Sequence, residues 1–133
     1  MRRISIALFI GLAFLSSCGK KAKSESEENA ELRRIAHKAM CYRLSGDVDG
    51  YLRMTLDYER LPQEYRSQLH DMMLQHLADE QERLGRLTAA SVVGDTLLSD
   101  DAAEVNVEMT WADSIKERVH LSLVRRDKQW WLK

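Results

Sequence analysis

The sequence predicts an α+β domain in which three helices are packed on a curved, four-stranded antiparallel sheet. Two observations support this prediction. Apolar residues recur every three to four positions from about Ala30 to Leu77, and every second position after Leu87. Helices that precede a meander cover its apolar face. The 133 residues and the formal charge of −1 suit one small domain and argue against a nucleic-acid binder that relies on overall basicity.

The first helix is predicted by an apolar stripe that runs from Leu32 to Leu44, with Arg33, Arg34 and Lys38 mostly outside it. It is expected to end at Ser45-Gly46, where glycine favours the left-handed conformation that closes a helix. Asp47 is placed to cap a second, short helix through Val48, Leu52 and Leu56.

Pro62 suits the first turn of the third helix. The stripe of this helix is Tyr65, Leu69, Met72, Met73 and Leu77. Its last turns, residues 79–86, are almost entirely polar and are interpreted as a solvated extension stabilised by charge pairs along the helix.

Four strands are predicted after Leu87. Residues 103–111 alternate most clearly, with apolar side chains at odd positions and Glu104, Asn106, Glu108 and Thr110 between them, so no carboxylate lies on the apolar side of this strand. Residues 115–126 repeat the alternation, and residues 88–98 form a less regular strand before them. The last strand runs from Gln129 to the end, with Trp130 and Leu132 on one face and Trp131 on the other.

The first 17 residues have the order of a signal peptide, with two arginines, a twelve-residue apolar run and small residues before Cys18. Leu15-Ser16-Ser17-Cys18 resembles the lipobox of bacterial lipoproteins. This resemblance implies cleavage before Cys18 and lipidation of its thiol with palmitate-type chains. We therefore expect an outer-membrane lipoprotein of the cell envelope, anchored to the membrane through lipid and facing the periplasm or the cell surface.

Removal of residues 1–17 leaves 18 Lys and Arg against 21 Asp and Glu, and no phenylalanine. Residues 18–29 begin with the cysteine expected to be lipidated and continue with lysine and glutamate residues. No bulky apolar residue follows Cys18 in this segment, which predicts a flexible spacer before a domain at residues 30–133. Cys41 then has no partner for a disulfide within the chain, and we expect a buried, inert thiol. His37 lies one turn before it.

Three segments of the domain are similar to the nuclear-transport-factor-2-like, or cystatin-like, cone fold, as found in small lipoproteins of Bacteroidetes-type bacteria. They are residues 45–52 (SGDVDGYL), 101–107 (DAAEVNV) and 126–132 (RDKQWWL). No short strand is evident at residues 58–60 and the chain ends within the last strand, which suggests a reduced cone.

The resemblance implies a cavity between the sheet and the helices. The residues expected to line it are Tyr42, Tyr51, Met54, Tyr58, Met72, Trp111 and Trp130. This set suits a small apolar ligand. Plain packing is the favoured alternative, because a domain without phenylalanine must fill its core with Tyr and Trp. Trp131 is the candidate for an exposed contact with a protein partner or a second copy through the sheet.

The sequence favours a non-catalytic binding or assembly module of the cell envelope. No phosphate loop, dinucleotide fingerprint or serine nucleophile elbow is present, and neither a cofactor nor nucleic acid is expected. His76 and Glu80 form a ligand pair without a third member, so no metal site is expected. The alternatives are a small hydratase- or isomerase-like enzyme that uses the cavity and a purely structural envelope protein.

Overall fold

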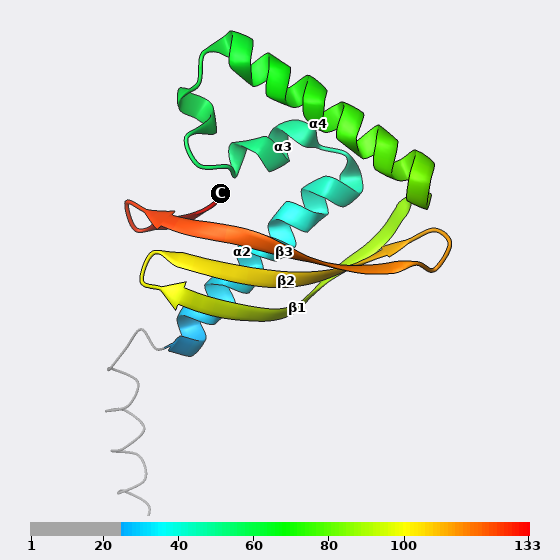
Figure 1. The fold of residues 1–133 in the computed structure, drawn as a ribbon. Helices are drawn as coiled ribbons and strands as arrows, with labels where there is room; N and C mark the ends of the chain where they lie inside the picture. The colour runs from blue at the N-terminus through cyan, green and yellow to red at the C-terminus, as the bar shows by residue number, and fades with distance from the viewer. Residues whose placement is uncertain (1–24) are drawn as a thin grey trace, which may run out of the picture. The chain divides into compact units, whose positions relative to one another are not determined.

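The computed structural model describes residues 25–133 (Figure 1). The expected signal peptide, Cys18 and the spacer up to residue 24 lie outside the described residues. The chain divides into two units between Ala30 and Glu31. The elements of the second unit are α2 (Glu25–Ser45), which begins in the first unit, α3 (Val48–Arg53), η1 (Tyr58–Arg60), α4 (Gln63–Leu84), β1 (Leu87–Ser99), β2 (Ala102–Trp111), β3 (Lys116–Arg126) and β4 (Gln129–Leu132). Among the described residues, no helix is both long and apolar enough to cross a membrane.

The four strands form one antiparallel meander in the order β1-β2-β3-β4, as the alternating pattern predicts. Odd-numbered residues of β2 are buried and even-numbered ones are partly exposed. Val107 pairs with Val92 of β1 and Val119 of β3, so the apolar positions of adjacent strands lie on one face. Trp130 and Leu132 of β4 are buried while Trp131 is half-buried, which confirms the predicted alternation of the last strand.

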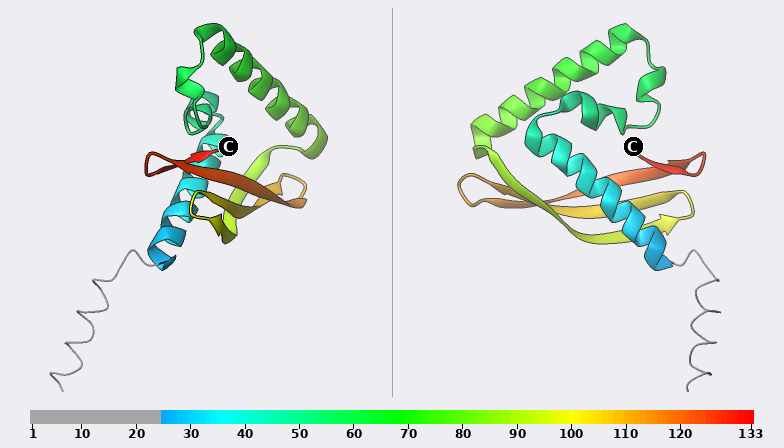
Figure 2. Two further views of the ribbon diagram at one scale, coloured as in Figure 1. Left: turned by 60° about the vertical axis from the view of Figure 1, so that its left-hand side comes forward. Right: turned by 180° about the vertical axis from the view of Figure 1, so that it is seen from behind.

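Helix α2, from Glu31 onward, crosses one face of the sheet (Figure 2). Its buried residues are Leu32, Ala36, Ala39 and Met40, and the two alanines allow the helix backbone to approach the strands. The helix ends where it was predicted to end, because Gly46 has a φ of 77°. It begins at Glu25, five residues earlier than the expected start near Ala30.

Helix α3 is shorter than expected. Asp47 caps it as predicted, since its carboxylate accepts a hydrogen bond of 2.9 Å from the Gly50 N–H. The helix ends at Arg53 and not at Leu56, because the next residues pair with the edge of the sheet. The N–H of Leu132 donates to the carbonyl of Met54, and the N–H of Leu56 donates to the carbonyl of Leu132, both at 2.8 Å. An isolated bridge at Thr55 therefore closes the open edge of β4 at Leu132.

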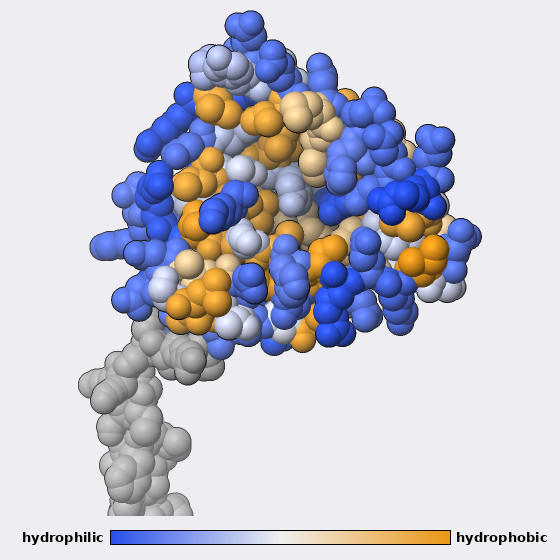
Figure 3. Space-filling view, in the orientation of Figure 1, coloured by the Kyte–Doolittle hydropathy of each residue, from blue (hydrophilic) through white to orange (hydrophobic). Residues whose placement is uncertain are grey.

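Helix α4 packs through a second apolar cluster, which contains the buried residues Val48, Leu52 and Tyr58 with Leu69, Met73 and Leu77 of α4 around them. Two members of the predicted stripe, Tyr65 and Met72, are exposed instead. The apolar residues that α4 contributes to this cluster thus lie four positions apart, in a narrower stripe than predicted. Figure 3 shows apolar side chains at the surface beneath α4.

Candidate functional site

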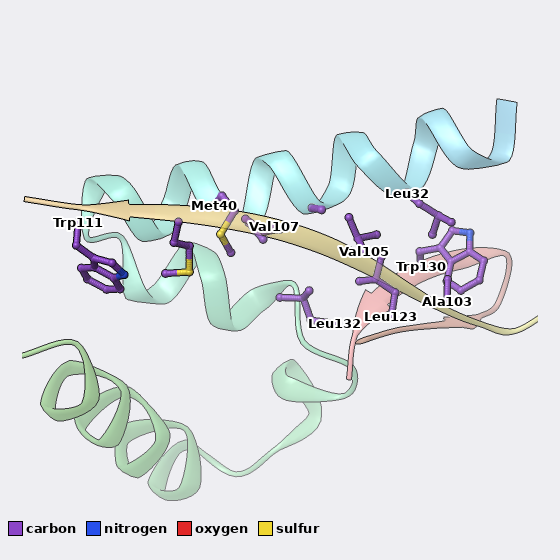
Figure 4. Packing of buried hydrophobic residues seen from close by; sticks show 12 residues of the cluster. Leu32, Met40, Ala103, Val105, Val107, Trp111, Leu123, Trp130 and Leu132 are labelled. Carbon is purple, nitrogen blue, oxygen red and sulfur yellow. The ribbon is translucent and has the colours of Figure 1, made fainter. Parts of the chain in front are cut away.

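The space between α2 and the sheet is filled by side chains. Met40, Val105, Val107, Leu123 and Leu132 meet there in one buried cluster (Figure 4). Trp111 and Trp130 belong to this cluster and are each 3% exposed, while Tyr51 and Met54 are half-buried and pack against it. These four residues were expected to line a cavity, and the structure places them in or against the core.

An open groove lies beside this core, between one flank of α2, the α3 region and β4. It encloses about 620 Å³. We call it the α2–β4 groove, and its lining residues are Glu31, Arg34, Ile35, Lys38, Tyr42, Asp47, Gly50, Arg53, Met54, Gln129, Trp130 and Trp131. Three residues of the predicted cavity set, Tyr42, Met54 and Trp130, meet here, together with Trp131, the candidate for an exposed contact. Gly50 is required at its position, because a Cβ there would lie 2.6 Å from ring atoms of Tyr42.

More cations than carboxylates line the groove. Arg34, Lys38 and Arg53 lie in its walls together with Glu31 and Asp47, and Arg53 is 3.9 Å from Glu59. Asp47 caps α3, and Glu31 lies 3.9 Å from Arg34. From the sequence, Arg34 and Lys38 were expected only to lie mostly outside the apolar stripe of the helix. Their spacing of one helical turn was the signal for a shared wall.

Trp130 adds a donor without an acceptor. Its indole Nε1 is buried and has no hydrogen-bond partner among the described residues. The guanidinium of Arg125 lies 5.2 Å from the centre of the ring, which is a cation–π contact. In Figure 4 the indole nitrogen lies on the side of the ring that faces α2, near Leu32. A buried N–H without an acceptor is costly, and this one faces the core, away from the open groove.

The other predicted site residues lie apart from the groove. Tyr58 is buried beneath α4, and its hydroxyl donates to the carbonyl of Arg66 at 3.5 Å. Met72 is 66% exposed on α4 and belongs to none of the pockets described here. Trp131 also borders a smaller pocket of about 200 Å³ beside Asp57 and Arg126, whose side chains form a hydrogen bond of 3.1 Å.

The predicted solvated run at the end of α4 contains a buried charge, so that interpretation is wrong for Glu80. The Glu80 carboxylate forms an ion pair with Arg43 of α2, and each side chain is 11% exposed. His76 approaches Glu80 at 3.4 Å. Burial raises the pKa of the nearby Tyr51 hydroxyl, while Arg43 lowers it and Glu80 raises it. No group of three residues able to hold a metal occurs in the described part of the chain.

A second carboxylate reaches the covered face of the sheet from β1. The register of β1 against β2 shifts between Val92 and Gly94, which marks a β-bulge. The extra residue brings Asp95 opposite Val105, on the face that packs against α2. The Asp95 side chain is 7% exposed and forms an ion pair with Arg33. The sequence predicts that no carboxylate lies on the apolar side of β2. On β1, by contrast, Asp95 lies on that side of the sheet.

Cys41 was expected to be buried and is exposed. Its Sγ lies 3.5 Å from Nε2 of His37 on the outer side of α2. The apolar stripe of α2 passes through Ala36, Ala39 and Met40, which leaves both residues outside the core.

No protein-family model and no curated protein sequence matches the chain. Among solved structures, a crystal structure from Campylobacter jejuni, described as a candidate NTF2-like transpeptidase, superposes with a TM-score of 0.54. The two chains are 17% identical, and the match covers 82% of this chain and 97% of the other. At this identity the likeness concerns the fold. Residues 25–133 therefore have the NTF2-like (nuclear-transport-factor-2-like) α+β fold, with three α-helices before a curved four-stranded antiparallel sheet.

Proposed function

We propose that this chain is a lipid-anchored protein of the cell envelope and acts there as a non-catalytic binding module through the α2–β4 groove. The observation that supports a binding role is the groove itself, whose volume of about 620 Å³ lies in the range of ligand sites. Its floor combines aromatic and aliphatic side chains with a few charged groups at the walls, which is the usual composition of a recognition site.

The two buried carboxylates favour binding over acid–base catalysis. A general base must be free to take a proton from a substrate. Glu80 is paired with Arg43, and Asp95 is paired with Arg33. Neither carboxylate lines the α2–β4 groove, so the groove and the buried charges are separate features.

The anchor is tested by metabolic labelling of the full chain with an alkyne analogue of palmitate in a Gram-negative host. The proposal expects label on the membrane-bound protein and loss of both label and membrane association in Cys18→Ala. Label that survives this substitution would contradict lipidation at Cys18.

Binding through the groove is tested by photo-crosslinking in intact envelopes. A photoreactive residue at Lys38, in the groove, is compared with one at Lys116, an exposed lysine on β3. The proposal expects crosslinked products that arise from position 38 and not from position 116. Identical products at the two positions, or none at either, would refute the groove as the binding site.

A further inference from the structure

The length of the α2–β4 groove suits a chain-like ligand. The residues of α2 that line it run from Glu31 to Tyr42 along one flank of the helix. Eleven steps at about 1.5 Å each make this wall about 16 Å long. An extended peptide rises about 3.3 Å per residue, so the wall matches roughly five residues of such a peptide.

The groove has a charged rim and an apolar floor. Arg34 and Lys38 stand one helical turn apart on one wall, and Arg53 comes from the end of α3. Ile35, Met54, Trp130 and Trp131 supply the apolar surface between them. In an extended peptide, successive side chains point to opposite sides. A peptide in which acidic and apolar residues alternate therefore presents carboxylates to the cations and apolar groups to the floor.

The polar groups of the groove match such a peptide. Its lining carries three cations, Arg34, Lys38 and Arg53, against two carboxylates, Glu31 and Asp47. Glu31 lies 3.9 Å from Arg34, and Asp47 accepts a hydrogen bond from the Gly50 N–H. The lining therefore has one positive charge in excess, which an acidic segment neutralises and a basic segment increases.

We infer that the α2–β4 groove binds an extended segment of a partner protein in which acidic and apolar residues alternate. This inference rests on the proposed binding function and names the class of partner. Recognition combines ion pairs at the rim with burial of apolar side chains against Met54 and the two tryptophans, as in other peptide-binding grooves. The rim charges add selectivity against basic segments.

The test measures fluorescence anisotropy of a labelled hexapeptide, acetyl-(Glu-Val)₃-amide, with the purified mature chain at low salt. We expect a dissociation constant on the order of 100 μM, which is typical of short peptides at small interfaces. Labelled acetyl-(Lys-Val)₃-amide is the basic control peptide and is expected to show no binding. Chitotetraose is tested as an alternative ligand, because tryptophan rings also stack on sugars.

The variants Arg34→Glu and Lys38→Glu are each expected to weaken peptide binding at least fivefold, since each replaces an attraction with a repulsion. Lys116→Glu on β3 is the matched control and is expected to leave binding unchanged. Both groove residues are exposed, so neither substitution is expected to change stability much. An unchanged midpoint of urea unfolding shows that the variants fold like the wild type.

Equal binding of the acidic and basic peptides, equal binding by wild type and the groove variants, or binding of chitotetraose alone would each overturn the inference. These outcomes are separate from the proposed function. If position 38 forms specific crosslinks in envelopes while the acidic peptide does not bind, the binding module stands and its partner class is wrong. If neither occurs, both proposals fail.

Discussion

The ion pair between Arg43 and Glu80 makes the sharpest prediction about stability. It joins α2 to α4, and each side chain is 11% exposed. Glu80→Ala would leave the Arg43 guanidinium in this environment without its counter-charge, and its Nε already has no partner among the described residues. Removing one member of a buried pair costs about 3–5 kcal/mol. Because both groups keep some contact with water, we expect a cost of about 3 kcal/mol, at the lower end of this range.

For a domain of this size, 1 kcal/mol corresponds to a shift of about 4–8 °C in melting temperature, so Glu80→Ala should lower it by roughly 12–24 °C. The assay is urea unfolding followed by tryptophan fluorescence, since Trp111 lies in the adjacent core. Glu82→Ala, two positions further on the exposed side of α4, is the matched control and should change stability by less than about 0.5 kcal/mol.

A double variant separates the charge effect from packing. Replacing Arg43 with Met and Glu80 with Leu removes both charges and retains apolar volume, and such replacements of buried pairs are often neutral or stabilising. The double variant should therefore be at least about 2 kcal/mol more stable than Glu80→Ala. The reasoning fails if Glu80→Ala costs no more than Glu82→Ala, or if the double variant is less stable than the single one.

Three further predictions concern buried groups elsewhere. Asp95→Asn should destabilise the domain by about 1 kcal/mol in urea unfolding, because it removes the charge paired with Arg33, whose own side chain is 50% exposed and keeps its contact with water; an unchanged midpoint would contradict this pairing. The raised pKa of Tyr51 means that the unfolded chain ionises first in alkali, so stability present below pH 10 falls as the pH rises through the folded pKa. Tyr51→Phe should flatten the alkaline loss of unfolding free energy between pH 9 and 11, and an equal slope in both proteins would refute this assignment. Gly50→Ala should cost about 1–3 kcal/mol through its clash with the Tyr42 ring, and the cost should fall in a Tyr42→Ala background; an equal cost in both backgrounds would exclude that clash.

The sheet could be predicted from the sequence because its signal is repeated. β2 alternates without interruption, and the alternation of β3 and β4 places Leu123, Trp130 and Leu132 on the buried face. Alternation of apolar and polar residues can be recognised within a single strand. Because three successive strands show it, the sequence predicts an antiparallel sheet with one buried face. Gly46 at the end of α2 and Asp47 at the start of α3 were also predicted correctly, because each residue acts on the backbone of its immediate neighbours.

The charged groups inside the domain could not be predicted, because their burial depends on partners far along the chain. Glu80 lies in a polar run that reads as a solvated face, and only the approach of Arg43, 37 residues earlier, places it in the interior. Asp95 faces inward because a bulge reverses the alternation of β1, and nothing in the local pattern of that strand marks the extra residue. The end of α3 was misplaced because Leu132, the penultimate residue, draws residues 54–56 to the sheet edge.

These features divide the polar residues of α2 into two sets with different roles. Arg33 and Arg43 extend to carboxylates on β1 and α4, so they hold the helix against the sheet at one end and against the long helix at the other. Arg34 and Lys38 line the groove on another flank of the helix. A groove wall keeps its shape only if the helix that carries it is fixed, and the two ion pairs supply that support from outside the groove. The same helix therefore contributes Arg33 and Arg43 to the stability of the fold and presents Arg34 and Lys38 in the groove, where the proposed acidic segment would contact them.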